Sequence, residues 1–218
     1  VIVISGILKN ECIEHHKRFL SYIINKRPYI ILKWAETDDG FIAPKEKNIN
    51  EPYWISNTKS RQLVHKWRSE EQAILVGAKT IREDNPRLTT REWEGKNCDV
   101  YILSKNGFKK DYKIFNQESK VTVLNEEKID FKKDIVKQIC KKFYDDKILS
   151  FIVEGGTKTL SNFIDTKTWD EMRVFKTKEK LRDGVKGPNI KFEESKKIEI
   201  GDNKLEYYLN KGTTFSNI

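Results

Sequence analysis

The sequence predicts an α/β fold in which helices flank a mixed, mostly parallel sheet, and three observations support this prediction. Short apolar runs at 29–34, 73–76 and 149–153 alternate with segments that show the three-and-four apolar spacing of amphipathic helices. The composition is 37% hydrophobic and includes 11 Phe, 8 Tyr and 5 Trp, which is enough apolar surface to form a core. Strands without intervening helices follow in the last part of the chain, which indicates antiparallel strands at one edge of the sheet.

The first third of the chain contains a predicted helix, two strands and a second helix. An apolar stripe from Cys12 to Ile23 indicates the first helix, and Pro28 ends it because the residue before a proline avoids the helical conformation. The run 29–34 predicts a central strand, and a turn at 38–40 leads to a short strand at 41–43. Ser56 and Thr58 are candidate caps for a helix that continues through Arg68.

The remaining elements continue the alternation of strands and helices. One short helix ends at Asp84, Asp134 caps another that carries apolar residues from Ile135 to Phe143, and a third covers 158–164. The predicted strands lie at 73–76, 100–103, 121–124, 149–153, 172–175, 190–192 and 205–209. In open α/β sheets ligands bind beyond the carboxyl ends of the strands, so the residues after each apolar run are the candidate site.

Composition and charge argue against several classes of protein. No run approaches the roughly twenty apolar residues that a membrane helix needs, and the N-terminal segment lacks a secretory signal. Cys12, Cys98 and Cys140 form no C-x-x-C pair, so we expect a cytoplasmic protein with neither a disulfide framework nor a metal site. The net charge of +9 is scattered along the chain, which is typical of a solvated surface but permits a patch for an anionic partner.

Two segments after predicted strands carry groups that suit a phosphate. In 154–159, paired glycines allow close backbone approach, and a helix start with Lys158 adds N–H donors and charge. The spacing fits neither a Walker loop nor the three-glycine dinucleotide motif, and a plain glycine turn explains the segment equally well. In 77–91, Arg87 and Arg91 suit an anionic ligand, while Asp84 is as easily a turn carboxylate as a functional one.

Two further positions have a structural and a functional interpretation. Trp54 can stack on a ligand ring, although most tryptophans belong to the core. Lys33 is expected at a strand end, and the small Ala35 beside it permits close approach of a ligand. His65 is expected to be a packing or surface residue.

Together these stretches resemble the pyrimidine reductase of riboflavin biosynthesis, the C-terminal half of the bifunctional deaminase-reductase. The resemblance covers most of 26–218, and 77–91 is its most specific part. It rests on 27–35 with Asp39 and Gly40, on 54–56, on 60–68, on 73–91 and on 151–159. It implies that residues 1–25 are the tail or linker of an upstream deaminase domain and that 26–218 form the reductase domain. The His-x-Glu and Pro-Cys-x-x-Cys zinc motif of the deaminase is absent from these residues, so no deaminase activity is expected of them.

The resemblance also implies a dihydrofolate-reductase-like fold, a homodimer, and NADPH-dependent reduction of the ribosyl group of 5-amino-6-(5-phosphoribosylamino)uracil. The implied substrate contacts are Arg68, Leu88, Arg91 and Glu154, with Lys33 near the sugar. The implied cofactor contacts are Ala35, Trp54, Thr80, Asp84, Ser104, Gly156, Thr157, Lys158, Thr159 and Leu160, in a run that continues to Asn162. Many relatives have a serine where this chain has Pro52, so one hydrogen bond to the substrate is in question.

These roles lead to a chemical hypothesis. Arg68 and Arg91 hold the substrate phosphate, because a guanidinium fork matches phosphate oxygens. Glu154 and Lys33 are the catalytic candidates for proton transfer, and we expect burial to raise the pKa of Glu154. Two alternatives stay open: another dihydrofolate-reductase-like reductase, acting on the diaminopyrimidinone or on folate, and a basic nucleic-acid-binding module. The sequence shows no RNA-recognition motif, zinc finger or helix-turn-helix in favour of the second.

Overall fold

A sheet of eight strands forms the centre of the molecule in a computed structural model that describes residues 2–4, 6–46 and 51–213. The strand order is β5-β4-β3-β6-β1-β7-β10-β9. The strands are β1 (Tyr29–Glu36), β3 (Ala73–Gly77), β4 (Asp99–Leu103), β5 (Val121–Leu124), β6 (Ser150–Val153), β7 (Glu171–Lys176), β9 (Lys196–Ile200) and β10 (Asn203–Leu209). Neighbours from β5 to β7 pair in parallel, whereas β10 and β9 are antiparallel additions at one edge. The predicted mixed, mostly parallel sheet is confirmed.

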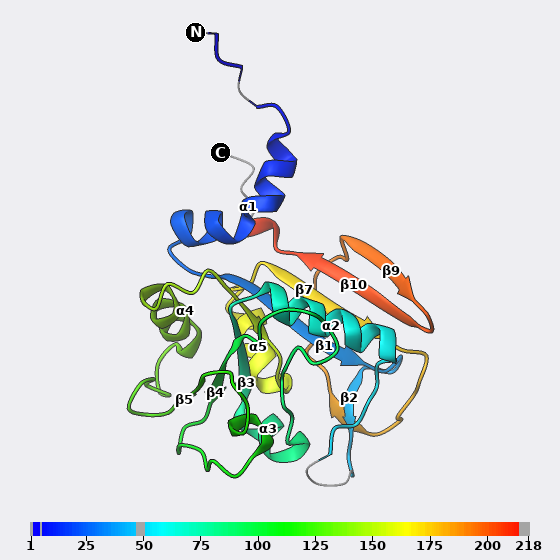
Figure 1. Cartoon of the computed structure of the whole chain (residues 1–218). Helices are drawn as coiled ribbons and strands as arrows, with labels where there is room; N and C mark the ends of the chain where they lie inside the picture. The colour runs from blue at the N-terminus through cyan, green and yellow to red at the C-terminus, as the bar shows by residue number, and fades with distance from the viewer. Residues whose placement is uncertain (1, 5, 47–50, 214–218) are drawn as a thin grey trace.

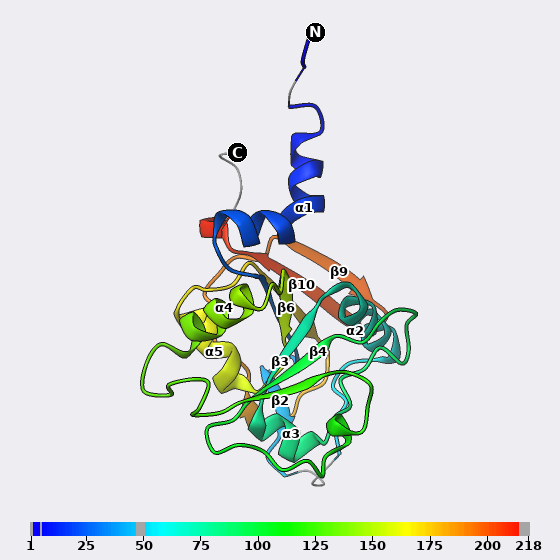
Figure 2. The ribbon, with the colours of Figure 1, turned by 60° about the vertical axis from the view of Figure 1, so that its left-hand side comes forward.

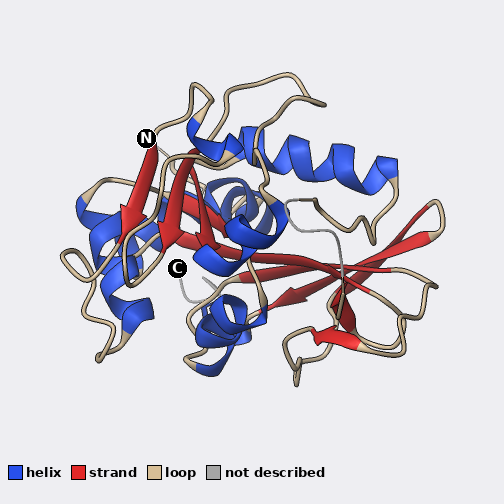
Figure 3. Ribbon diagram, turned by 90° about the horizontal axis from the view of Figure 1, so that it is seen from below, coloured by secondary structure: helices blue, strands red, loops and turns tan. Residues whose placement is uncertain are grey.

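Helices cover both faces of this sheet (Figure 1, Figure 3). The helices are α1 (Lys9–Ile24), α2 (Thr58–Glu70), α3 (Ala78–Asp84), α4 (Ile135–Asp145) and α5 (Thr157–Asp165). On one face, Phe143 of α4 and Phe163 of α5 pack against Phe151 of β6, with ring centroids 4.8 and 6.0 Å away. On the other face, Trp67 of α2 stacks on Phe175 of β7 at 5.5 Å. The apolar runs therefore form strands that are buried on both faces, as parallel strands usually are.

Two predictions for the last part of the chain need correction. Residues 190–192 form no strand: Pro188 lies just before them, and Phe192 instead packs edge-on against the buried Trp169, with ring centroids 5.0 Å apart. The edge strand is β9, which reads Lys-Lys-Ile-Glu-Ile and therefore contains no continuous apolar run. A small second sheet, β2 (Phe41–Pro44) with β8 (Gly184–Lys186), was predicted only in its first strand.

The N-terminal cap of α2 is neither of the two residues predicted for it. The side chain of Asn57 accepts a hydrogen bond from the Ser60 backbone N–H at 2.8 Å, and so caps the helix. Asn57 also donates to the carbonyl of Ile200 at 2.7 Å. The cap therefore ties α2 to the edge strands. By contrast, Asp134 caps α4 as predicted, accepting from the Lys137 N–H.

Helix α1 lies across the amino ends of the strands and extends away from the sheet (Figure 1, Figure 2). Polar contacts hold its C-terminal half: Arg18 pairs with Glu71, and Lys17 lies 3.2 Å from Glu171. Large apolar side chains are exposed in the segment before the helix, at Ile2, Val3, Ile4, Ile7 and Leu8, and near its C-terminal end, at Phe19, Ile23 and Ile24. The division of the chain at residue 25 stays a prediction.

Candidate active site

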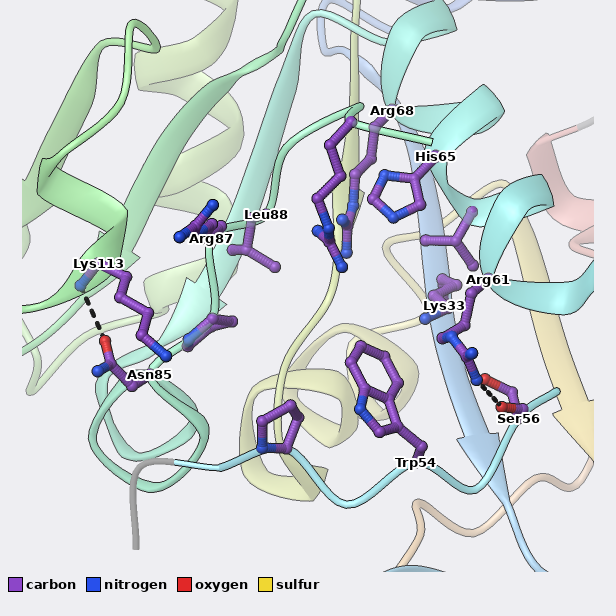
Figure 4. A pocket seen from close by; sticks show the side chains of 14 residues that line it. Lys33, Trp54, Ser56, Arg61, His65, Arg68, Asn85, Arg87, Leu88 and Lys113 are labelled. Atoms are coloured by element: carbon purple, nitrogen blue, oxygen red, sulfur yellow. Dashed lines mark hydrogen bonds between the residues drawn. The ribbon is translucent and has the colours of Figure 1, made fainter. Parts of the chain in front are cut away.

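A pocket of about 330 Å³ opens on the α2 side of the sheet, near the carboxyl ends of its central strands. Six of the fourteen described residues that line it are Lys or Arg, and none of the fourteen is Asp or Glu. The lining residues are Lys33, Pro52, Trp54, Ser56, Arg61, Val64, His65, Arg68, Asn85, Pro86, Arg87, Leu88, Arg91 and Lys113. Figure 4 shows Asn85, Arg87 and Lys113 on one side of the pocket and Lys33, Arg61 and His65 on the other. Segments from β1, α2, the stretch after α3 and a distant loop thus meet around one space.

Glu154 is not one of the lining residues but contacts two of them, Arg68 and Lys33. Arg68 donates to it through two parallel hydrogen bonds of 2.8 Å, from Nε to Oε1 and from Nη2 to Oε2. The Nζ of Lys33 lies 3.6 Å from Oε2. Glu154 directly follows β6, and Lys33 lies inside the neighbouring parallel strand β1, which continues to Glu36 rather than ending near Lys33. The predicted catalytic pair is therefore brought together.

The charges in this cluster reverse one expectation. Burial alone raises the pKa of a carboxyl group, but Arg68 and Lys33 outweigh it and lower the pKa of Glu154 to about 2. The prediction of a raised pKa for Glu154 is wrong. Burial lowers the pKa of Lys33, more than the Glu154 carboxylate raises it. Glu154 is thus an anion at neutral pH, and Lys33 is the better candidate for a group that releases a proton.

The arrangement of Arg68 limits its predicted role as a phosphate ligand. Its fork is occupied by Glu154, and Nη1 donates to the carbonyl of Thr89 at 3.1 Å. Arg91 has a side chain that is 40% exposed, and its nearest carboxylate, that of Glu92, lies 3.7 Å away. Arg91 is therefore freer than Arg68 to bind an incoming anion.

Sequence reasoning missed two cations of the pocket. Arg61 precedes Arg68 by two helical turns on α2, and this spacing could have identified it, because residues seven apart lie on one face of a helix. Lys113 comes from a loop distant in sequence and carried no local signal. It reaches the pocket because its backbone N–H donates to Oδ1 of Asn85 at 2.8 Å.

The stretch that carries Leu88 has an unusual backbone. Asn85 and Leu88 have φ values of 41° and 57°, in the left-handed region that residues with a Cβ rarely occupy. Leu88 is nonetheless buried and lines the pocket. Such local strain persists where surrounding packing imposes it, often at functional sites. Leu88 stays a predicted substrate contact.

His65 was predicted to be either a packing or a surface residue, and it is a buried packing residue. It also lines the pocket. Burial, and then the charges of Arg68 and Arg91, lower its pKa to about 4. It is therefore neutral at physiological pH and adds no charge to the pocket.

Trp54 lies at the pocket and is 54% exposed, so it is not a core tryptophan. Pro52 also lines the pocket, at the place where many relatives are expected to carry a serine. The ring of Pro52 provides no hydroxyl there.

Two of the residues predicted to hold the cofactor, Thr80 and Thr159, lie beside the glycines at the ends of β3 and β6. Oγ1 of Thr80 accepts a hydrogen bond from the N–H of Gly156 at 3.0 Å. A Cβ at Gly77 would lie 2.7 Å from Oγ1 of Thr159, so only glycine permits this close approach. Gly77, Gly155 and Gly156 are partly exposed and Lys158 beside them is exposed, so backbone N–H groups and a cation are available for the phosphates of a dinucleotide.

The other predicted cofactor contacts differ in what they offer. Ala35 is half-buried on β1, and Asp84 is the last residue of α3. The hydroxyls of Thr157 and Ser104 donate to the carbonyls of Lys186 and Gly107, respectively. Leu160 is fully buried and its N–H donates to the carbonyl of Gly156, and its role as a cofactor contact stays a prediction.

The described residues contain no group of three or more His, Cys, Asp or Glu side chains that could hold a metal ion. They also contain no helix long and apolar enough to cross a membrane.

The sheet order and the site at its carboxyl end define the dihydrofolate-reductase-like class of α/β domains. The dihydrofolate reductase of Enterococcus faecalis, solved in complex with NADP(H) and RAB-propyl, has the same fold with a TM-score of 0.51 over 83% of this chain and 95% of its own, at 14% identity. The chain belongs to the RibD C-terminal domain family, whose model matches residues 28–177.

Relatives outside the dihydrofolate reductases are more similar. The riboflavin biosynthesis protein RibD of Aquifex aeolicus is 31% identical over 187 residues, which are 78% of this chain and 52% of that protein. The diaminohydroxyphosphoribosylaminopyrimidine deaminase/5-amino-6-(5-phosphoribosylamino)uracil reductase of Thermotoga maritima has a TM-score of 0.85 at 29% identity, covering 96% of this chain and 64% of its own. The chain thus spans about half to two thirds of the length of these relatives.

Proposed function

We propose that the protein is an NADPH-dependent reductase of riboflavin biosynthesis that converts the ribosyl group of 5-amino-6-(5-phosphoribosylamino)uracil to the ribityl chain. The observation that carries the proposal is the ionised Glu154 held between Lys33 and Arg68 beside a cation-lined pocket, in a chain of the RibD C-terminal domain family. Membership of this family supports the reaction type, and the surplus of cations supports a phosphorylated substrate.

NADPH would supply the hydride. Thr80, Gly156 and Lys158 are proposed to hold its phosphates, with Thr157, Thr159, Asp84 and Ser104 nearby, and Ala35 and Trp54 would contact its flat ring. The backbone at the glycines and the charge of Lys158 favour this placement. These residues would hold the cofactor beside the sugar, and orientation of the two reactants would supply much of the rate.

The protein's own chemical contribution is the control of charge and protons at the sugar. Hydride addition to the anomeric carbon, which is part of an imine or a carbonyl in the opened sugar, leaves negative charge on the nitrogen or oxygen. That atom needs a proton. Lys33 is proposed to donate it from Nζ, since its lowered pKa eases release. Glu154 keeps Lys33 in place and stays ionised. Arg91 is proposed to bind the phosphate, with Leu88 beside it.

The decisive test follows NADPH absorbance with purified protein and the phosphoribosylamino-uracil. We expect oxidation of NADPH and formation of the ribitylamino product. A folded sample that neither oxidises nor binds NADPH would overturn the proposal. Comparing turnover on the deaminated substrate, the diaminopyrimidinone and dihydrofolate separates the proposed reaction from the alternative reductases. The homodimer and the cytoplasmic location stay predictions, and light scattering checks the first.

A further inference from the structure

Trp54 occupies its place at the pocket without support from regular secondary structure. It belongs to the irregular stretch before α2, and 54% of its surface is exposed. An exposed indole on an irregular segment can adopt several orientations unless another group restricts it. The position of Trp54 at the pocket therefore needs a specific cause.

Arg61 restricts Trp54 in two ways. Its guanidinium carbon lies over the indole, 4.8 Å from the ring centroid, at the distance of a cation–π contact. The same guanidinium donates from Nη1 to the carbonyl of Ser56 at 2.7 Å and from Nη2 to Oγ1 of Thr58 at 3.0 Å. Figure 4 shows the bond to Ser56 beside Trp54. Arg61 thus joins α2, the backbone after Trp54 and the ring itself.

We propose that Arg61 is a positioning residue that covers one face of Trp54 and presents the rest of the indole to the flat ring of NADPH. The inference rests on the proposed function for the identity of the ligand. A planar guanidinium held by two hydrogen bonds is a rigid support. With one indole face occupied, a single flat ring can stack on the other.

The test measures the Kd of NADPH and the steady-state constants for wild type, Arg61→Ala and Arg61→Lys. We expect Arg61→Ala to weaken NADPH binding and raise its KM about fivefold, as loss of a cation–π support predicts. At saturating NADPH, kcat should stay within about twofold of wild type, since Arg61 does not touch the reacting atoms. Arg61→Lys keeps the charge but not the planar fork, so its Kd for NADPH should lie between those of wild type and Arg61→Ala.

A double-mutant cycle with Trp54→Leu distinguishes support of Trp54 from direct contact with the ligand. If Arg61 acts through Trp54, adding Arg61→Ala to Trp54→Leu weakens NADPH binding no further. Equal weakening in both backgrounds would mean that Arg61 acts on the ligand directly and would overturn the inference.

The matched control is Lys66→Ala. Lys66 lies on the same helix, with Nζ 5.6 Å from the ring centroid of Trp93, and it does not line the pocket. Its removal should leave the Kd of NADPH unchanged. If wild type binds NADPH and Arg61→Ala binds it equally well, the inference alone fails. If wild type does not bind NADPH, the proposed function fails with it.

Discussion

The two ends of the central strands differ in how their charges are balanced. At the amino end, Arg27 forms a fork with Asp170, Arg18 pairs with Glu71, and Glu171 accepts from Arg173 and lies near Lys17. At the carboxyl end, six cationic side chains line the pocket: Lys33, Arg61, Arg68, Arg87, Arg91 and Lys113. Among the carboxylates of the described residues, only those of Glu154 and Glu92 form ion pairs with members of this set.

This difference separates anchoring from binding. Paired charges at the amino end hold α1 and the first residues of the strands in place. Surplus cations at the carboxyl end raise the local concentration of an anionic ligand. The two ends should therefore respond differently to the loss of one carboxylate.

The largest effect is expected from Glu154→Gln. This change leaves Lys33 and Arg68 buried without their shared anion, so we expect kcat to fall by about 100-fold or more and the free energy of unfolding to fall by about 3 kcal/mol. Turnover assays and urea denaturation measure the two effects. The control is Glu126→Gln, which removes an exposed pair with Lys105 and should change neither quantity measurably. Unchanged turnover in Glu154→Gln would remove Glu154 from the mechanism.

At the opposite end, Asp170→Asn should destabilise the protein without affecting catalysis. Asp170 accepts the fork of Arg27 and the N–H of Ile30 at 2.8 Å, so its loss should lower the free energy of unfolding by about 3 kcal/mol. The turnover of the folded fraction should match wild type. A selective loss of turnover would contradict the separation of the two ends.

The pH dependence of turnover tests the roles within the pocket. Glu154 has a pKa lowered to about 2, so it stays ionised at every pH at which assays are practical and contributes no acid limb. Lys33 must be protonated to donate, so turnover should fall by about tenfold per pH unit once pH exceeds its pKa, which burial places below the usual value. A decline of turnover above a midpoint near pH 6, present in wild type and absent in Glu154→Gln, would instead identify Glu154 as the proton donor.

A smaller effect is expected from Arg91→Gln. Loss of one charged hydrogen-bond donor should raise the KM of the phosphorylated substrate by about tenfold, while the Kd of NADPH stays unchanged. The effect should shrink at high ionic strength, because Arg91 is partly exposed. The isosteric control at the same end is Lys79→Met, an exposed cation outside the pocket that pairs with Glu83. Equal KM values for both variants would contradict the assignment.

Particular elements show how far sequence reasoning reaches. β1 and β6 were predicted because an unbroken apolar run can be satisfied only by burial on both faces. β9 was missed because it pairs with β10 at the edge of the sheet, and three of its five residues are charged, so no apolar run marks it in the sequence. The cap of α2 was misassigned by one residue, since the choice among Ser56, Asn57 and Thr58 depends on the contact of Asn57 with the edge strands.

Some features of the site were also predicted from the sequence, and others were not. Lys33, Arg91 and Glu154 were predicted from their positions near strand ends, Arg68 from the predicted helix, and all four also from the family resemblance; all four lie at or directly behind the pocket. The pKa of Glu154 was predicted in the wrong direction, because burial was visible from the sequence whereas the two flanking cations were not. Lys113 could not be predicted, because a loop closes onto Asn85 only in the folded chain.

By itself the sequence determined the alternation of strands and helices, the apolar core and the types of side chain at the strand ends, because these follow from local periodicity and composition. Only the tertiary structure decided which charges become neighbours, and hence which carboxylate is ionised, which arginine is free and which indole is supported. The physical reason is that electrostatic and stacking energies depend on distances of a few ångströms between residues far apart in the chain, and only folding sets these distances.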